Sequence, residues 1–413
     1  MSSMPDSYAT YLFHEGTNYQ AHKMFSPVPA AENGTEGWKF AVWAPNAAAV
    51  SVVGEFNGWD RTAHPMCEEG GIWSLFIPGL KQYDTYKYAV TDKKGRTVFK
   101  CDPYGLHFET APANASKLYD ITGYRWKDRK WMKERQDYNP YGSPMNIYEI
   151  HAGSWRRYKD GNCLSYAALA DQLIPYLKKM GYTHVELMPV TEYPFDGSWG
   201  YQVTGMFAPT SRYGTPHDFM EFVDRCHRSG IGGIRGVVAA SLPRDERGRA
   251  MYGGTPLYAY AGPRKGGHKE WGTKVYDFGK NEVKSFLISA AMFWFDEYHI
   301  DGIRCDAVAS MLYLDYGRKD GEWTPNVYGG NYNLEAKEFL QKMNTAILSK
   351  HRGAITIAEE STAFPMVTLP AYQGGLGFTP TRDKGWMTNT LHYISHEPCN
   401  RKDKHNKLTF AIT

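Results

Sequence analysis

Apolar residues recur along the chain with two different spacings, and the spacing changes near residue 145. From Gly37 onward, short runs alternate apolar with polar residues and are separated by turns rich in Gly, Pro and Asn. Runs of this kind, spaced at about ten residues, predict the strands of a β-sandwich; they lie at 38–43, 50–53, 73–76 and 85–90. We expect the sandwich to occupy residues 21–118, after a lead-in at 1–20.

From Met145 onward, predicted strands alternate with predicted helices. Helices with apolar residues three and four positions apart are expected at 165–180, 215–230, 281–298 and 334–350. Strands are expected at 146–153, 184–190, 231–238, 300–306 and 354–359, with a sixth beginning at Gly377. This alternation is typical of a parallel sheet and of a β/α barrel. Residues 119–144 lack periodicity and are predicted to be a linker.

The fold class predicted is therefore multidomain: an N-terminal β-sandwich followed by an incomplete (β/α)8 TIM barrel. The barrel domain is expected at 145–413. It is expected to stop after about six strands, because the sequence ends at Thr413 where eight strands would be needed.

Charged residues stand at the ends of two consecutive strands of the predicted barrel. Arg304 and Asp306 are two positions apart, so their side chains share one face of a strand. Glu359 ends the next strand, and neighbouring strands lie about 4.8 Å apart. The two acids could therefore approach the separation of about 5–5.5 Å used by retaining glycosidases. Spacing alone also allows a surface ion pair at 304 and 306, or an incidental pair of acids.

The composition limits the kinds of partner molecule that we expect for this chain. The formal net charge is +3, so no nucleic acid is expected. Aromatic residues make up 15% of the chain, which suits either stacking on sugar rings or an aromatic-rich core. The six cysteines show no C-x-x-C spacing, which argues against a metal centre or a disulfide framework. Neither a signal segment nor an apolar run of about 18 residues is present, so a soluble, cytoplasmic protein without a membrane partner is expected.

Longer motifs carry a resemblance to a known family. Residues 40–46 and 52–60 resemble the glycogen-binding-type sandwich of glycogen branching enzymes, which is similar to carbohydrate-binding module 48. Residues 301–312 and 357–362 resemble the second and third signature regions of 1,4-alpha-glucan branching enzymes in the alpha-amylase clan (glycoside hydrolase family 13 type). Further matches lie in order at 147–155, 186–202, 263–266, 271–273 and 330–335.

The resemblance implies a set of catalytic roles. On the family's pattern, Asp306 is the nucleophile and Glu359, rather than Glu360, is the general acid/base. Arg304 orients the nucleophile, and Tyr201 stacks at the subsite of the sugar to be transferred. The implied reaction of glycogen biosynthesis cleaves an alpha-1,4 glucan such as glycogen or amylose. It transfers the segment to a 6-hydroxyl by a retaining double displacement, forming an alpha-1,6 branch without a metal or organic cofactor. No oligomeric state is indicated.

The chain departs from the family's pattern at its first signature region, which corresponds to residues 230–242. An expected Asp is Gly236, and an expected sugar-contacting His is Ser241. Arg235 lies within a strand that should be apolar, where an unpaired buried charge costs several kcal/mol. The fourth signature region is absent. We therefore expect an impaired or inactive branching enzyme. The changes at 236 and 241 favour a degenerate copy over simple truncation.

Two alternatives remain open at this point. A hydrolase of the same clan would share the acidic pair, although the Glu186-Leu-Met-Pro-Val motif favours branching. A non-catalytic glucan-binding protein would retain the sandwich and the glucan contacts without turnover.

Overall fold

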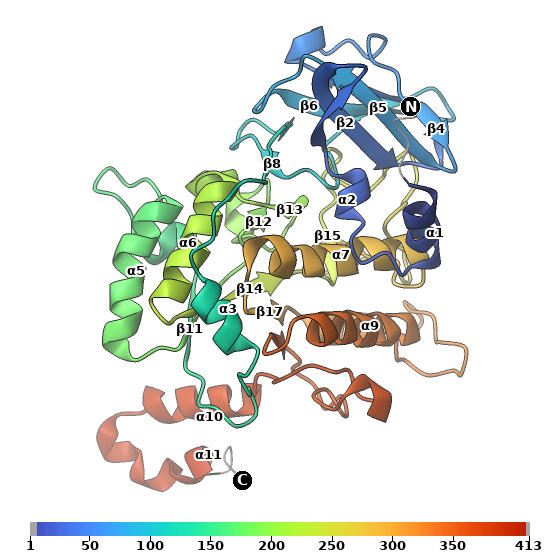
Figure 1. Cartoon of the computed structure of the whole chain (residues 1–413). Coiled ribbons are helices and arrows are strands. Elements are labelled where there is room, and N and C mark those ends of the chain that lie inside the picture. The colour runs from blue at the N-terminus through green and yellow to red at the C-terminus, as the bar shows by residue number, and fades with distance from the viewer. Residues whose placement is uncertain (1–5, 410–413) are drawn as a thin grey trace.

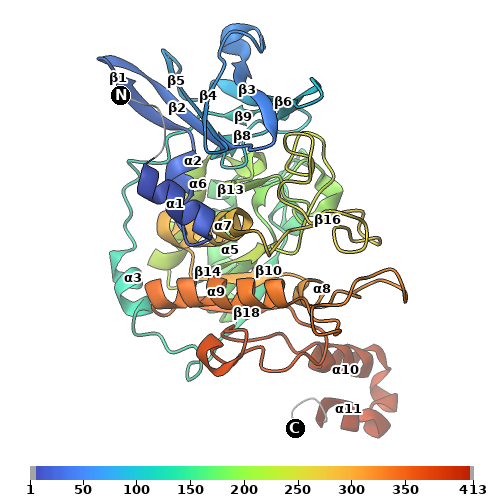
Figure 2. The same ribbon diagram turned by 90° about the vertical axis from the view of Figure 1, so that its right-hand side faces the viewer.

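The computed structural model describes residues 6–409, so residues 1–5 of the expected lead-in and 410–413 of the expected barrel lie outside the described residues. Two antiparallel sheets form the N-terminal part, and a parallel sheet covered by helices forms the rest (Figures 1 and 2). The order predicted from the sequence, a sandwich followed by an incomplete β/α barrel, is confirmed.

The sandwich consists of one sheet in the order β1-β2-β5-β4 and a second in the order β3-β6-β9-β8, with β7 paired to β6. Along β2 the side chains of one face, Trp38, Phe40 and Val42, are buried, and at the C-terminal end Ala41 and Trp43 of the other face are buried too. The strands are β1 (Val28–Glu32), β2 (Thr35–Trp43), β3 (Ala47–Gly54), β4 (Cys67–Glu69), β5 (Ile72–Pro78), β6 (Thr85–Asp92), β7 (Thr97–Lys100), β8 (His107–Phe108) and β9 (Ser116–Lys117).

The parallel sheet has five strands in the described residues, in the order β10-β11-β14-β17-β18, and it does not close. Its strands are β10 (Ile147–Ile150), β11 (His184–Leu187), β14 (Gly232–Val237), β17 (Gly302–Cys305) and β18 (Ile355–Ala358). The sixth strand expected from Gly377 is reduced to a single parallel bridge between Ala358 and Thr381. Short antiparallel pairs flank the sheet: β12 (Thr191–Glu192) with β13 (Gly205–Pro209), and β15 (Ser241–Leu242) with β16 (Lys274–Val275).

The covering helices begin and end where the sequence signals them. Ser165 caps α5 (Tyr166–Met180), and Thr215 forms a capping box with Asp218 at the start of α6 (Pro216–Arg228). The remaining long helices are α7 (Asn281–Tyr298), α9 (Leu334–Lys350) and α10 (Lys384–Ser395). Short helices are α2 (His22–Phe25), α4 (Ala152–Trp155), α8 (Val308–Leu312) and α11 (Asn406–Thr409). Among residues 6–409, none of the helices combines the length and the apolar character that crossing a membrane requires.

The predicted lead-in and the predicted linker each contain a helix that tertiary contacts hold in place. Within the lead-in, α1 (Ser7–Glu15) lies on α7, where the Ser285 hydroxyl donates to the carbonyl of Phe13 at 3.0 Å. Within the predicted linker, α3 (Arg129–Arg135) packs near α6. A helix of seven residues is too short to hold itself, so its order comes from what it touches.

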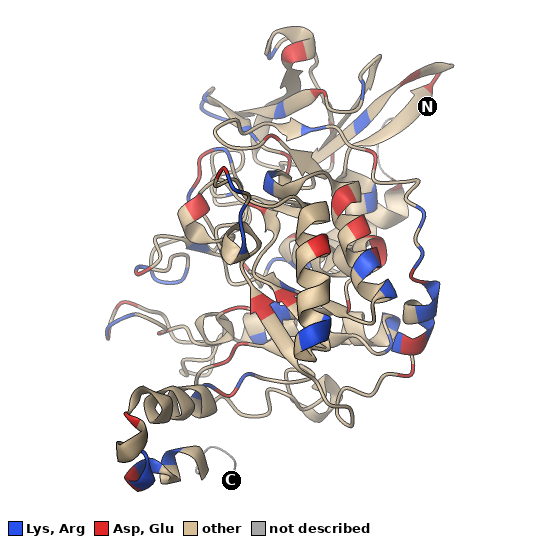
Figure 3. Ribbon diagram, turned by 90° about the vertical axis from the view of Figure 1, so that its left-hand side faces the viewer, with Lys and Arg blue, Asp and Glu red and all other residues tan. Residues whose placement is uncertain are grey.

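The sandwich and the barrel share one continuous hydrophobic core. Tyr104, between β7 and β8, stacks on Phe25 and on Phe207 with ring centroids 4.8 Å apart in each case, and meets Phe286 of α7 edge-on. Basic and acidic residues are interspersed over both parts (Figure 3).

Candidate active site

The four residues expected from the sequence come together at the C-terminal ends of β17 and β18. Arg304, which is 7% exposed, donates from Nη1 to Asp306 Oδ1 and to the Tyr201 hydroxyl, the latter at 3.4 Å. The same guanidinium places Nη2 3.9 Å from Glu359 Oε2. One cation thus contacts both acids.

Glu359 is fixed by two further donors. The backbone N–H of Ala307 donates to Glu359 Oε2 at 2.8 Å, and the ammonium of Lys384 pairs with Oε1. Ala307 has φ of 51°, in the left-handed region, which is uncommon for a residue with a Cβ and is typical of functional sites. The neighbouring Glu360 turns instead to Thr362, accepting its N–H at 3.0 Å.

The cluster also contains charged residues that the sequence did not single out as site residues. Glu186, on β11, accepts from Arg382 Nη2 at 2.6 Å, and Glu149, on β10, accepts from Arg382 Nη1 at 3.0 Å. The second oxygen of Glu186 lies 4.0 Å from Arg304 Nε, too far for a hydrogen bond. Glu186 stood in a recognised motif, so its strand could be predicted. No signal in the sequence pointed to Arg382 or Lys384.

Burial dominates the electrostatics of these groups. It raises the pKa of Asp306, while the Arg304 guanidinium opposes that rise. Burial, reinforced by the nearby Asp306 carboxylate, raises the pKa of Tyr201 to about 12. Burial also raises the pKa of Glu186. A partly exposed carboxylate with a cationic neighbour, next to the buried carboxylate of Glu359, is an arrangement that suits covalent glycosyl transfer.

A cavity of about 410 Å³ opens beside Asp306. Asp306, Tyr201 and Ser241 line it, together with Trp271, Gln202 and Thr273. This volume is that of a small-molecule site, and Trp271, 40% exposed, offers an aromatic face.

The departures from the family's pattern lie in and behind this cavity. Gly236 pairs with Arg304 across β14 and β17, and a Cβ at position 236 would lie 3.0 Å from Cδ of Pro189. Arg235, on the helix-facing side of β14, is 1% exposed and stacks at 4.0 Å over Trp294. Its Nε and Nη1 lack hydrogen-bond partners among the described residues, and burial lowers its pKa to about 9. The expectation of a buried, unpaired charge in this strand is confirmed.

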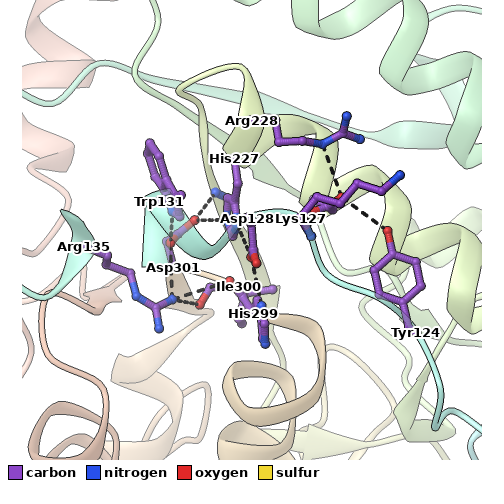
Figure 4. A network of polar contacts seen from close by, with 12 residues as sticks. Tyr124, Lys127, Asp128, Trp131, Arg135, His227, Arg228, His299, Ile300 and Asp301 are labelled. Atoms are coloured by element: carbon purple, nitrogen blue, oxygen red, sulfur yellow. Dashed lines mark hydrogen bonds and ion pairs between the residues drawn. The ribbon is translucent and has the colours of Figure 1, made fainter. Parts of the chain in front are cut away.

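At the opposite end of β17, Asp301 anchors a buried polar network (Figure 4). It accepts from Trp131 Nε1 at 2.8 Å, from the backbone N–H of Gly233 at 2.7 Å and from Arg135 at 3.3 Å. His227 lies between Asp301 Oδ2, 2.8 Å from Nε2, and Asp128 Oδ2, 2.9 Å from Nδ1. With a carboxylate on each ring nitrogen, both nitrogens must donate, so the ring is an imidazolium.

Trp131 and Arg135 belong to α3, and Asp128 immediately precedes it. The network therefore explains why a helix forms in the predicted linker. Burial alone would lower the pKa of His227, but Asp301 and Asp128 raise it to about 9. In return, although burial opposes it, the imidazolium holds the pKa of Asp301 well below its usual range.

Known proteins are similar to this chain along nearly its whole length. The family of carbohydrate-binding module 48 (isoamylase N-terminal domain) matches residues 25–105. A 1,4-alpha-glucan branching enzyme GlgB of Rubrobacter xylanophilus is 52% identical over 98% of this chain and 56% of its own length. A branching enzyme GlgB of Thermosynechococcus vestitus is 50% identical over 97% of this chain and 56% of its own length. The chain thus spans about half the length of the curated relatives it matches.

Solved structures support the fold. A protein of Salmonella typhimurium assigned as an alpha amylase superposes with a TM-score of 0.67 at 20% identity, covering 93% of this chain and 59% of that chain. At that identity the likeness concerns architecture alone.

Proposed function

Because the chain belongs to the 1,4-alpha-glucan branching enzymes, we propose that its barrel carries the glucan-transfer site of such an enzyme. The substrate proposed is an alpha-1,4 glucan such as amylose or glycogen. The observation that carries the proposal is the single guanidinium of Arg304, which pairs with both Asp306 and Glu359, while Asp306 lines an open cavity.

In the proposed reaction, the Asp306 carboxylate attacks C1 of a glucosyl unit while Glu359 gives a proton to the departing 4-oxygen. A glycosyl ester on Asp306 results. The 6-hydroxyl of a second glucan then attacks C1, Glu359 takes the hydroxyl proton, and Asp306 is released. Two displacements at one carbon retain its configuration.

Arg304 acts on the nucleophile in this scheme. Its positive charge favours the ionised form of Asp306, which burial disfavours. Its Nη1 lies against Asp306 and its Nη2 faces Glu359, so the guanidinium fixes the positions of the two acids relative to each other. Tyr201 is uncharged. Its half-buried ring lines the cavity, where it would stack on the sugar to be transferred.

We propose low turnover for this chain. Gly236 supplies no carboxylate beside Arg304, and the Ser241 hydroxyl, which lines the cavity, cannot reach a sugar as an imidazole would. Position 236 is also crowded by Pro189, so a restored aspartate would have to displace that ring.

The test compares the chain with Asp306→Asn, Ser241→His and the double variant Gly236→Asp/Ser241→His on amylose. We expect a slow shift of the iodine stain without release of reducing sugar, faster in Ser241→His and absent in Asp306→Asn. Release of reducing sugar together with the stain shift would indicate a hydrolase instead.

A second candidate, a non-catalytic glucan-binding protein, is favoured by the changes at Gly236 and Ser241. It predicts retardation of the chain in amylopectin affinity gels, with no change in stain or chain length for any of these variants.

A further inference from the structure

The segment after β18 directs two cations into the candidate site. Arg382 and Lys384 are two positions apart, and both side chains end on acids of the cluster. We propose that Lys384 is an inhibitory residue, which occupies the proton-donating oxygen of Glu359 and suppresses its role as an acid. This inference rests on the proposed function, in which Glu359 is that acid.

Both oxygens of Glu359 are already engaged. Oε2 accepts the N–H of Ala307, and Oε1 accepts the ammonium of Lys384. An oxygen that accepts a proton donor of this kind cannot at the same moment donate a proton to a departing sugar oxygen. The ion pair therefore competes directly with the first half of the transfer reaction.

The chain holds Lys384 in this place through its backbone. The N–H of Ala358 donates to Pro380 O at 3.1 Å, and the N–H of Arg382 donates to Ala358 O at 3.0 Å. These bonds fix the segment alongside β18, whose next residue is Glu359. The contacts of Arg382 with Glu149 and Glu186 fix the segment from the other side.

The Lys384 side chain itself is only lightly held. It is 45% exposed, whereas that of Glu359 is 10% exposed. Lys384 is the first residue of α10, and none of the residues of α10 is buried. Replacing its ammonium should therefore change the site without disturbing a packed core.

Leaving-group chemistry separates this role from others. Fluoride departs from α-maltosyl fluoride as a stable anion, so Asp306 can displace it with no proton from Glu359. An alkoxide departing from amylose needs that proton, and general acid catalysis of this kind is worth about 10²–10⁴-fold. Inhibition at Glu359 should suppress the second reaction and spare the first.

The experiment measures both rates in the first turnover, before Glu359 acts as the base of the second displacement. It compares the unmodified chain, Lys384→Met, Lys384→Arg and the control Lys402→Met, an exposed lysine elsewhere in the C-terminal segment. We expect Lys384→Met to raise the amylose rate about tenfold or more relative to the fluoride rate. Lys384→Arg and Lys402→Met should leave the ratio unchanged.

The two proposals fail differently in this assay. Fluoride release by every variant, with a ratio that Lys384→Met does not change or lowers, would overturn the inhibitory role and leave the proposed function standing. Release from neither substrate by any variant would overturn the proposed function and, with it, this inference.

Discussion

The two ends of β17 place similar charges in opposite circumstances. At the N-terminal end, Asp301 is 2% exposed and four donors surround it. At the C-terminal end, Asp306 has one cationic partner and faces a cavity, and Arg304 Nε lacks a hydrogen-bond partner among the described residues. The first arrangement stabilises the fold, whereas the second leaves polar groups available to a ligand.

The contrast between the two ends of β17 is tested most directly by removing Asp301 and Asp306 in turn. Asp301→Ala leaves the His227 imidazolium and Arg135 without their carboxylate, so we expect a loss of about 3–5 kcal/mol in the free energy of unfolding. Asp306→Ala should cost less, about 1–2 kcal/mol, because Asp306 is partly exposed at the cavity and Arg304 keeps a second carboxylate, that of Glu359, at 3.9 Å. Urea denaturation of both variants measures the difference, and equal losses would contradict the contrast between the two ends.

The next largest effect concerns pH. Because the pKa of His227 is raised from 6.5 to about 9, its contribution to stability is complete below pH 6.5 and is lost as pH rises toward 9. That loss is about 3 kcal/mol. Because the pKa values of Asp128 and Asp301 are lowered, their contribution is present above about pH 4 and is lost in acid.

Urea midpoints measured between pH 6 and 9.5 test this prediction. The variant His227→Gln should show a flat profile across the alkaline part of the range. A parallel decline in that variant would assign the pH dependence to another group.

Arg235 sharpens the comparison, because it is a buried cation that lacks the carboxylates His227 has. Arg235→Met keeps an apolar contact with Trp294 and removes a desolvated charge. We expect the free energy of unfolding to rise by about 1–2 kcal/mol. Thermal denaturation beside Arg125→Met, an exposed control, measures the change. A loss of stability would mean that the stacking on Trp294 outweighs the desolvation.

The smallest effect is expected at Tyr124, at the rim of the polar network around Asp301 (Figure 4). The Tyr124 hydroxyl donates to Glu221 at 2.6 Å in a half-buried position. Tyr124→Phe removes that bond and a longer one, of 3.5 Å, to Asp224, and should cost about 1 kcal/mol. The same denaturation assay detects it, and a cost comparable to that of Asp301→Ala would mean that the rim is as critical as the centre.

Local signals in the sequence were sufficient for the long elements. The spacing of apolar residues placed α7 and α9 at their observed bounds, and caps at Ser165 and Thr215 marked helix starts, because each of these depends on neighbours within a few positions. The pairing of β17 with β18 followed from their order in a parallel sheet.

What escaped prediction depends on distant partners. α3 is too short for its pattern to be read, and it is held by Asp301 and His227, far along the chain. Arg382 meets Glu149 across 233 positions, and Lys384 looks like an ordinary solvated lysine until β18 is placed beside it. Side chains that act by meeting such partners leave no periodic trace.

The shared core around Tyr104 has a mechanical consequence. An edge-on aromatic contact joins Tyr104, between β7 and β8, to Phe286 of α7, and α1 lies on the same helix. The sandwich is therefore packed against the barrel and is not joined to it by a flexible linker alone. A polymer bound to the sandwich would therefore lie at a fixed distance from Asp306. The packing between the two parts, and not the length of a flexible linker, would determine which segment of that polymer reaches the cavity.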